Sequence, residues 1–142
     1  VWIVIRLALP RRPLMMTIDP QGIQQVMINL LNNACDAVQE RGGDGDKIVK
    51  VAAHTENGER FVVAITDFGT GIPAALLGKV REVFFPSKPA GKGTGLGLAI
   101  VGDILKAHSG SLVIESEEGG YTTVTVSLPL DFKPAEPQEA GV

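Results

Sequence analysis

Four glycines at alternating positions, Gly91, Gly93, Gly95 and Gly97, lead directly into an apolar run that reaches Ile100. Glycine lets the backbone approach an anion closely and adopts positive φ without penalty. A helix that starts directly after such a loop turns its unpaired N–H groups and the positive end of its dipole toward the same anion. The run therefore predicts a phosphate-binding loop, with a flexible loop that only caps a helix as the alternative.

Three better-known phosphate and magnesium motifs do not fit this chain. A dinucleotide fingerprint, G-x-G-x-x-G, needs a third glycine where this run has leucine or isoleucine. A Walker loop needs Ser or Thr directly after Gly-Lys, but Lys92 is followed by Gly93. The triplet Asp67-Phe68-Gly69 matches that of eukaryotic-type protein kinases, but the Val-Ala-Ile-Lys and His-Arg-Asp segments of such kinases are absent.

Composition indicates one globular domain. The chain has 142 residues, of which 44% are hydrophobic and 20% charged, and its net charge is −3. This balance gives no general attraction for nucleic acid or for an anionic membrane, so we expect neither as a partner. Cys35 is the only cysteine, which predicts a structural thiol in a reducing compartment. The apolar N-terminal nine residues are too short for a membrane span, which needs about 20 residues.

The first half of the chain predicts two hairpins and a long helix. Strands over 2–9 and 14–18 would form an edge hairpin. Asp19 as N-cap and Pro20 at the first helical position begin a helix that runs to about Glu40. Strands over 47–55 and 60–66 would form a second hairpin around Asn57-Gly58, a strong turn signal.

The second half predicts two more helices and a closing hairpin. A short helix over 73–83 precedes a Pro-, Gly- and Lys-rich loop over 84–94 that has the composition of a lid. A helix over 95–108 follows, and strands over 111–116 and 122–129 close the domain. We expect a domain over 1–130 and a disordered tail over 131–142, where Pro, Glu and Ala dominate.

Two groups of polar residues predict a ligand site. Asn29, Asn33 and Asp36 lie four and three residues apart, so they form one row on the long helix. Asn is a mediocre helix former, and the row indicates ligand contacts, with an exposed polar face as the alternative. Asp67 ends a predicted strand and is followed by two glycines, Gly69 and Gly71, an arrangement that is typical of ligand sites.

Four ordered blocks resemble those of the catalytic, ATP-binding domain of bacterial sensor histidine kinases. This family shares a superfamily with DNA gyrase, the Hsp90-type chaperones and MutL. The blocks are Asn29–Ala37 (N box), Asp67–Ile72 (G1 box), Phe84–Lys88 (F box) and Gly93–Leu98 (G2 box). The resemblance covers residues 2–129. Within the F box region, Arg81 and Pro86 depart from the usual Phe and Thr.

The resemblance implies a Bergerat-type fold, an α/β two-layer sandwich whose mixed, mostly antiparallel sheet carries about three helices on one face. It also implies ATP and Mg²⁺ as ligands. Asn33 would ligate magnesium, and Asp67 would accept from the adenine amino group, with Thr122 nearby. The full set of implied cofactor-binding residues is Asn29, Asn33, Asp36, Asp67, Gly69, Gly71, Ile72, Lys88, Lys92, Gly93, Thr94, Gly95, Leu96, Gly97, Leu98 and Thr122.

The resemblance further implies phosphoryl transfer to a histidine. Superfamily ATPases carry a general-base Glu at the position of Asn29, and an amide cannot accept the proton. Neither His54 nor His108 is followed by the Glu of a phosphoacceptor helix, so no residue of this chain would act as phosphoacceptor. The acceptor would lie on a dimerisation and phosphoacceptor domain, normally upstream in the same protein, which would pass phosphate to a response regulator.

Three alternatives to this function stay open at the level of sequence. The chain could be a superfamily ATPase, or a nucleotide-binding interaction module without transfer activity. Related regulators that share the same blocks phosphorylate Ser, so the acceptor residue is also open. The expected location is cytoplasmic, either as a free protein or as the cytoplasmic part of a membrane-bound sensor.

Overall fold

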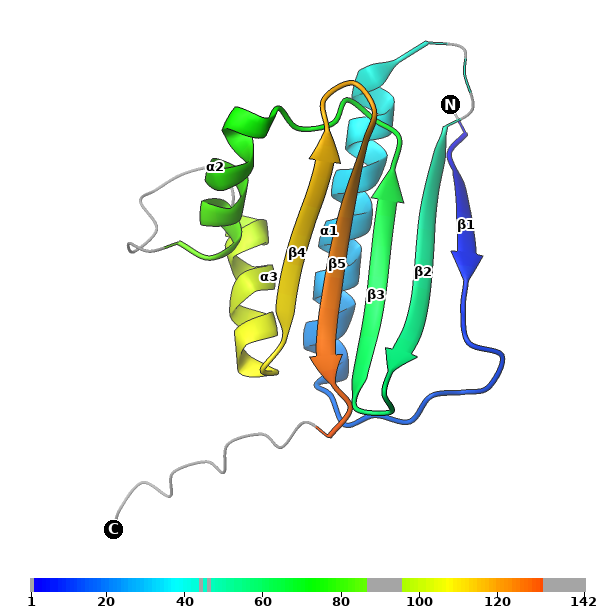
Figure 1. The fold of residues 1–142 in the computed structure, drawn as a ribbon, viewed down its shortest axis with the longest axis vertical. Coiled ribbons are helices and arrows are strands. Elements are labelled where there is room, and N and C mark those ends of the chain that lie inside the picture. The colour runs from blue at the N-terminus through cyan, green and yellow to red at the C-terminus, as the bar shows by residue number, and fades with distance from the viewer. Residues whose placement is uncertain (1, 44, 46, 87–95, 132–142) are drawn as a thin grey trace.

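The computed structural model describes residues 2–43, 45, 47–86 and 96–131. Within these residues the chain forms five strands and three helices in the order β1-α1-β2-β3-α2-α3-β4-β5. Figure 1 shows a twisted sheet with the long helix α1 along one face and with α2 and α3 beside β4. The predicted lid loop, except for its first residues, and nearly all of the predicted tail lie outside the described residues.

The sheet has the strand order β1-β2-β3-β5-β4. Its members are β1 (Val4–Ala8), β2 (Ile48–Glu56), β3 (Arg60–Asp67), β4 (Ser111–Glu117) and β5 (Tyr121–Pro129). Only β1 and β2 run parallel, and the other neighbouring pairs are antiparallel. The structure thus confirms the predicted mixed, mostly antiparallel sheet of an α/β two-layer sandwich.

Helix α1 (Pro20–Arg41) begins and ends where its sequence predicts. The Asp19 carboxylate accepts a hydrogen bond from the Gln21 N–H at 3.2 Å, as expected of an N-cap, and proline follows at the first helical position. Its buried residues recur every four positions, at Val26, Leu30, Ala34 and Val38. This spacing turns one face of α1 onto the sheet.

Helices α2 (Ala74–Phe84) and α3 (Leu96–Ala107) complete the helical layer. Both helices contact β4, and α3 also contacts α1 and α2. Val101 and Leu105 of α3 are fully buried, as is Ile65 at the centre of β3. One apolar core therefore joins the three helices to the inner face of the sheet.

The predicted N-terminal hairpin is wrong. β1 pairs in parallel with β2, and residues 14–18 form no strand but only an isolated bridge between Thr17 and Asp131. Pro10 and Pro13 lack the N–H groups that a hairpin ladder would need across the connection. The prediction that β1 lies at a sheet edge is confirmed.

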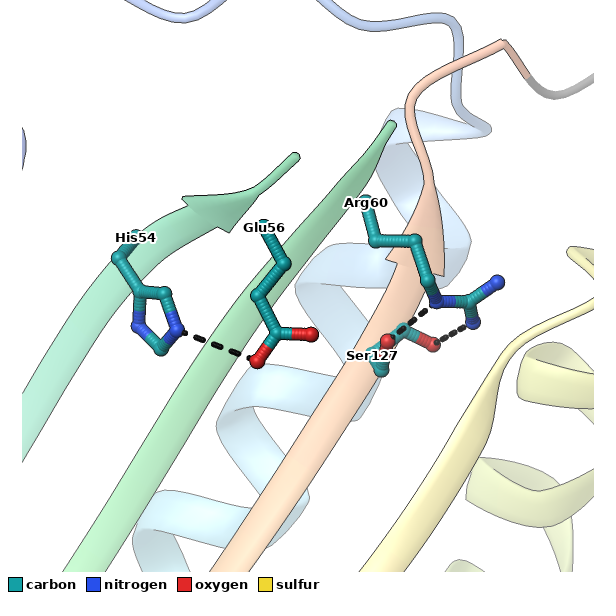
Figure 2. A network of polar contacts seen from close by, with 4 residues as sticks. All are labelled: His54, Glu56, Arg60 and Ser127. Atoms are coloured by element: carbon teal, nitrogen blue, oxygen red, sulfur yellow. Dashed lines mark hydrogen bonds and ion pairs between the residues drawn. The ribbon is translucent and has the colours of Figure 1, made fainter. Parts of the chain in front are cut away.

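Polar contacts at one end of the sheet include an Arg60–Ser127 pair that joins β3 to β5 and a His54–Glu56 pair within β2 (Figure 2). Arg60 donates from Nε to the Ser127 hydroxyl at 2.6 Å and from Nη2 to the Ser127 carbonyl at 3.3 Å. His54 lies 3.5 Å from the Glu56 carboxylate, but both side chains are more than half exposed, so this pair contributes little. Arg60 begins β3 whereas Asp67 ends it, so this network is remote from the candidate site.

In the part of the chain that the structure describes, no helix is long and apolar enough to cross a membrane.

Candidate functional site

A cavity of about 140 Å³ opens between α1, the ends of β3 and β5, and helices α2 and α3. Most of its wall is apolar, and the residues with polar side chains that line it are Asn33, Asp67, Thr70 and Thr122. The lining residues are Leu30, Asn33, Ala34, Ala37, Ile65, Asp67, Thr70, Gly71, Ile72, Val80, Phe84, Leu98, Ile114, Thr122 and Val124. An apolar slot with few polar groups is the usual form of a small-molecule site.

Asp67 is the buried charge of this cavity. It ends β3 opposite Thr122 of β5, and only 5% of its surface is exposed. Its Oδ1 accepts a hydrogen bond from the Gly69 N–H at 3.0 Å. Burial raises the pKa of the Asp67 carboxyl, and the Gly69 hydrogen bond opposes this in part. A ligand that donates a hydrogen bond to this buried carboxylate would stabilise its charged form.

The loop after Asp67 passes so close to other backbone segments that two of its positions require glycine. A Cβ on Gly69 would meet the Ala37 carbonyl group of α1. Gly71 has φ +70°, and a Cβ there would overlap the Glu117 carbonyl oxygen of β4. The two glycines thus let the loop wedge between α1 and the β4–β5 turn, which brings Ile72 into the cavity wall.

Arg41, at the C-terminal end of α1, fastens this loop from outside. Its Nη1 donates to the Phe68 carbonyl at 2.9 Å, with longer contacts to the Gly69 and Gly120 carbonyls at 3.4 and 3.5 Å. The Gly119 N–H also donates to the Thr70 carbonyl at 2.7 Å. The loop after Asp67 is therefore held to both α1 and the β4–β5 turn.

The row of polar residues on α1 is placed along one side of the helix, as its spacing indicates. Asn33 is exposed and lines the cavity. Asn29 is half-buried and Asp36 is exposed, and neither lines the cavity.

Cys35, also on α1, is half-buried. Burial, together with the carboxylates of Asp36 and Asp67, raises the pKa of its thiol, which keeps the thiol protonated.

The glycine-rich segment falls mostly outside the described residues. Lys88, Lys92, Gly93, Thr94 and Gly95 lie there, so their predicted roles stay predictions. Leu96 and Gly97 form the first turn of α3, as a phosphate-binding helix start would require. Leu98, one residue on, lines the cavity. The start of α3 therefore lies at the same cavity as Asp67.

Several residues of the site were not predicted from sequence. The apolar walls come from Leu30, Ala34, Val80, Phe84 and Val124. Their helical or alternating spacing predicted burial but gave no signal that part of the buried surface would line a cavity. Arg41 and Ser116, whose side chains hold the loop after Asp67, carried no sequence signal at all.

A family model described as "Histidine kinase-, DNA gyrase B-, and HSP90-like ATPase" matches residues 18–132. The sensor histidine kinase ZraS of Escherichia coli K12 is 36% identical over 120 residues, 84% of this chain and 24% of ZraS. Sporulation kinase C of Bacillus subtilis is 38% identical over 112 residues, 79% of this chain and 24% of that kinase. The chain thus spans about a quarter of the length of these relatives.

A solved structure of the catalytic domain of histidine kinase ThkA, in a nucleotide-free form, superposes with a TM-score of 0.72 at 27% identity. The match covers 91% of this chain and 81% of the ThkA domain. Sequence and fold thus agree, and the chain belongs to the family of histidine kinase-, DNA gyrase B- and HSP90-like ATPases.

Proposed function

We propose that this chain is the ATP-binding catalytic domain of a two-component sensor histidine kinase, and that it transfers the γ-phosphate of Mg-ATP to a histidine outside the chain. The observation that carries the proposal is the buried Asp67 carboxylate in an apolar cavity at the start of α3. The relatives named as sensor kinases, whose length the chain covers only in part, support the same function.

The adenine ring occupies the apolar cavity in this proposal. Ile72, Val124 and the other apolar side chains contact the two faces of the ring. The Asp67 carboxylate accepts a hydrogen bond from the exocyclic amine of adenine. A charged acceptor of this kind contributes about 1.5–3 kcal/mol, more than a neutral one.

The phosphates extend from the cavity toward Asn33 and the first turn of α3. Backbone N–H groups of Gly93, Gly95, Leu96, Gly97 and Leu98 would bind phosphate oxygens, helped by the helix dipole and by Lys88 or Lys92. Asn33 suits magnesium because its amide oxygen is a hard ligand, lies at the cavity and is exposed, so an ion there can share the ATP oxygens. Asn29 and Asp36, one turn to either side, would support the phosphates or the ion.

Asn29 favours transfer over hydrolysis. An amide offers no basic site for the proton of an attacking water, whereas a histidine nucleophile attacks phosphorus without such a base. Catalysis would then rest on alignment and on charge stabilisation of the transferring phosphoryl group. A superfamily ATPase and a nucleotide-binding module without transfer activity are the two competing functions.

Labelled phosphate distinguishes the three functions. The purified chain is incubated with Mg-ATP labelled at the γ-position, with and without a supplied helical domain that carries an acceptor histidine. We expect label on the acceptor in an acid-labile, alkali-stable form, and negligible free phosphate without the acceptor. Release of phosphate at about 1–10 s⁻¹ would support the ATPase instead, and acid-stable label would indicate a Ser acceptor. Binding of ATP with no transfer at all would support the interaction module.

The variant Asn29→Glu tests why hydrolysis is slow. Supplying a carboxylate one turn before Asn33 should raise phosphate release above that of the wild-type chain, because it restores a general base to water. Asn32→Glu makes the same change at an exposed position of the same helix that does not line the cavity, so it is the matched control for the added charge. Equal phosphate release by both variants would contradict the role of Asn29.

The remaining parts of the proposal concern the whole protein. The acceptor histidine lies on a dimerisation domain, normally upstream in the same chain, and a response regulator receives phosphate from it. The location is cytoplasmic, as a free protein or as the cytoplasmic part of a membrane-bound sensor. Coexpression of the full-length protein with candidate regulators, followed by phosphotransfer profiling, tests the partner directly.

A further inference from the structure

The hydroxyl of Ser116, on β4, makes three hydrogen bonds beside the cavity. It accepts from the Ile72 N–H at 2.8 Å and donates to the Tyr121 carbonyl at 2.8 Å. Its third partner is the hydroxyl of Thr122, 2.7 Å away. Ser116 thus joins the loop after Asp67 to the start of β5, although it does not itself line the cavity.

These three contacts determine which group accepts the proton of the Thr122 hydroxyl. A serine hydroxyl has one proton to donate and two lone pairs to accept with. The proton of Ser116 goes to the Tyr121 carbonyl, which can only accept, and one lone pair takes the Ile72 N–H. The other lone pair is left for Thr122, so Thr122 donates to Ser116 and keeps only lone pairs for the cavity.

Thr122 and Asp67 form the polar end of the cavity together. They are directly opposite one another on β5 and β3, both are buried, and both line the cavity. Side chains opposite each other on one face of antiparallel strands have Cβ atoms about 5 Å apart. Asp67 presents carboxylate oxygens and Thr122 presents lone pairs, so these two side chains offer hydrogen-bond acceptors only.

We propose that Ser116 is a positioning residue for base specificity: by taking the Thr122 proton, it commits the polar end of the cavity to 6-amino purines and against 6-oxo purines. An exocyclic amine carries two N–H donors, one for each of these acceptors, whereas the oxygen of a 6-oxo group places its lone pairs against theirs and leaves N1–H as the single donor on that edge of the base. The inference rests on the proposed function, which places adenine at Asp67, and adds the residue that fixes the direction of the second hydrogen bond.

The test compares ATP with inosine triphosphate, which carries an oxygen in place of the 6-amino group. Calorimetry in the presence of Mg²⁺ gives the dissociation constants of both nucleotides for the wild-type chain and for Ser116→Ala. We expect the wild-type chain to bind ATP at least about tenfold more tightly. In Ser116→Ala the Thr122 hydroxyl is free to turn its proton toward the base, so this ratio should fall about fivefold, mainly because inosine triphosphate binds better.

Two further variants separate specificity from a loss of structure. Ser111→Ala makes the same change at an exposed position of the same strand and should leave the ratio unchanged. Ser116→Thr retains the hydroxyl and should retain the ratio. If Ser116→Ala does not fold, Ser116→Cys takes its place. Its thiol is a weak acceptor, so it should also lower the ratio of ATP affinity to inosine triphosphate affinity.

The possible outcomes distinguish the two proposals. Equal affinity of the wild-type chain for both nucleotides would overturn the placing of adenine at Asp67. A wild-type preference for ATP that persists in Ser116→Ala, or a fall in both affinities by one common factor, would overturn the role of Ser116 alone. A ratio that narrows in Ser116→Ala and not in Ser111→Ala supports it.

Discussion

Replacing Asp67 by asparagine should change ligand affinity and stability in opposite directions. The Asp67 side chain is 5% exposed, and its Oδ1 already accepts from the Gly69 N–H at 3.0 Å. The asparagine oxygen can keep that hydrogen bond, which turns the new NH₂ group toward the cavity, where a donor would meet the donor of the adenine amine. Losing a charged acceptor costs about 1.5–3 kcal/mol, so ATP affinity should fall about ten- to a hundredfold.

The stability of the ligand-free domain should rise in the same variant. Burial raises the pKa of Asp67 above its ordinary value of 3.8, so between these two pKa values the folded state binds more protons than the unfolded state. The free energy of unfolding therefore falls as pH rises through that window. The amide of the variant carries no charge, so the variant would not lose this stability at neutral pH.

Calorimetry with ATP and urea unfolding at several pH values measure both effects. We expect the urea midpoint of Asp67→Asn to exceed that of the wild-type chain at pH 7, with the difference shrinking as pH falls toward 3.8. Asp103→Asn, at an exposed position of α3, is the control for loss of a negative charge. Unchanged ATP affinity, or a ligand-free variant less stable than wild type at pH 7, would refute the reasoning.

Three further substitutions test two supports of the cavity and one contact at the far ends of α1 and α3. Arg41→Met removes the donor to the Phe68 carbonyl and should lower the urea midpoint by the equivalent of about 0.5–1.5 kcal/mol. Arg41→Lys retains a cationic donor group and should restore part of this stability. Gly71→Ala should weaken ATP binding in calorimetry by more than tenfold, since left-handed backbone costs about 1–2 kcal/mol for alanine and the new Cβ would overlap the Glu117 carbonyl. Gly119 has φ +76° and open space around it, so Gly119→Ala bears the backbone cost alone. An equal loss of ATP affinity in both variants would contradict the role of the overlap. His108→Leu removes the Nε2 acceptor of the Asp19 N–H, 3.0 Å away, and should destabilise the domain by about 1–3 kcal/mol in urea, whereas the exposed His54→Leu should not.

Local sequence signals predicted most of the elements because each signal acts within a few residues. Asp19-Pro20 marks the start of α1, and Asn57 and Gly58 both adopt the positive φ that their hairpin turn needs. Near the end of α3 the positive φ belongs to Ser109, not to Gly110 as expected of a glycine C-cap. A Cβ on Gly110 would contact Leu128 and Ser127, so packing against β5 explains that glycine.

Long-range pairings were harder to predict. The N-terminal hairpin was predicted from two apolar runs separated by a proline turn, but Val4 to Ala8 pair in parallel with β2, more than forty residues away in sequence. No local pattern encodes a parallel pairing, because the strand that pairs with β1 is determined by the tertiary arrangement of the whole sheet. Asp67 and Thr122 lie opposite each other for the same kind of reason, the register of β3 on β5.

The supports of the site are also products of tertiary structure. Arg41 reads in the sequence as an ordinary basic residue at a helix end, and Ser116 as a polar residue within a strand. Their roles arise only where α1, the loop after Asp67 and the β4–β5 turn converge. The roles of Lys88 and Lys92, which lie outside the described residues, stay predictions.

The position of the adenine ring in solution tests the account most directly. Nuclear Overhauser effects can be recorded between the adenine protons of a bound, non-hydrolysable ATP analogue and the methyl groups of the isotope-labelled chain. We predict contacts to Ile72, Ile114 and Val124, which line the cavity around Asp67. Contacts instead to Leu9, Leu14 or Ala53, which line a separate groove beside β1, would contradict the account.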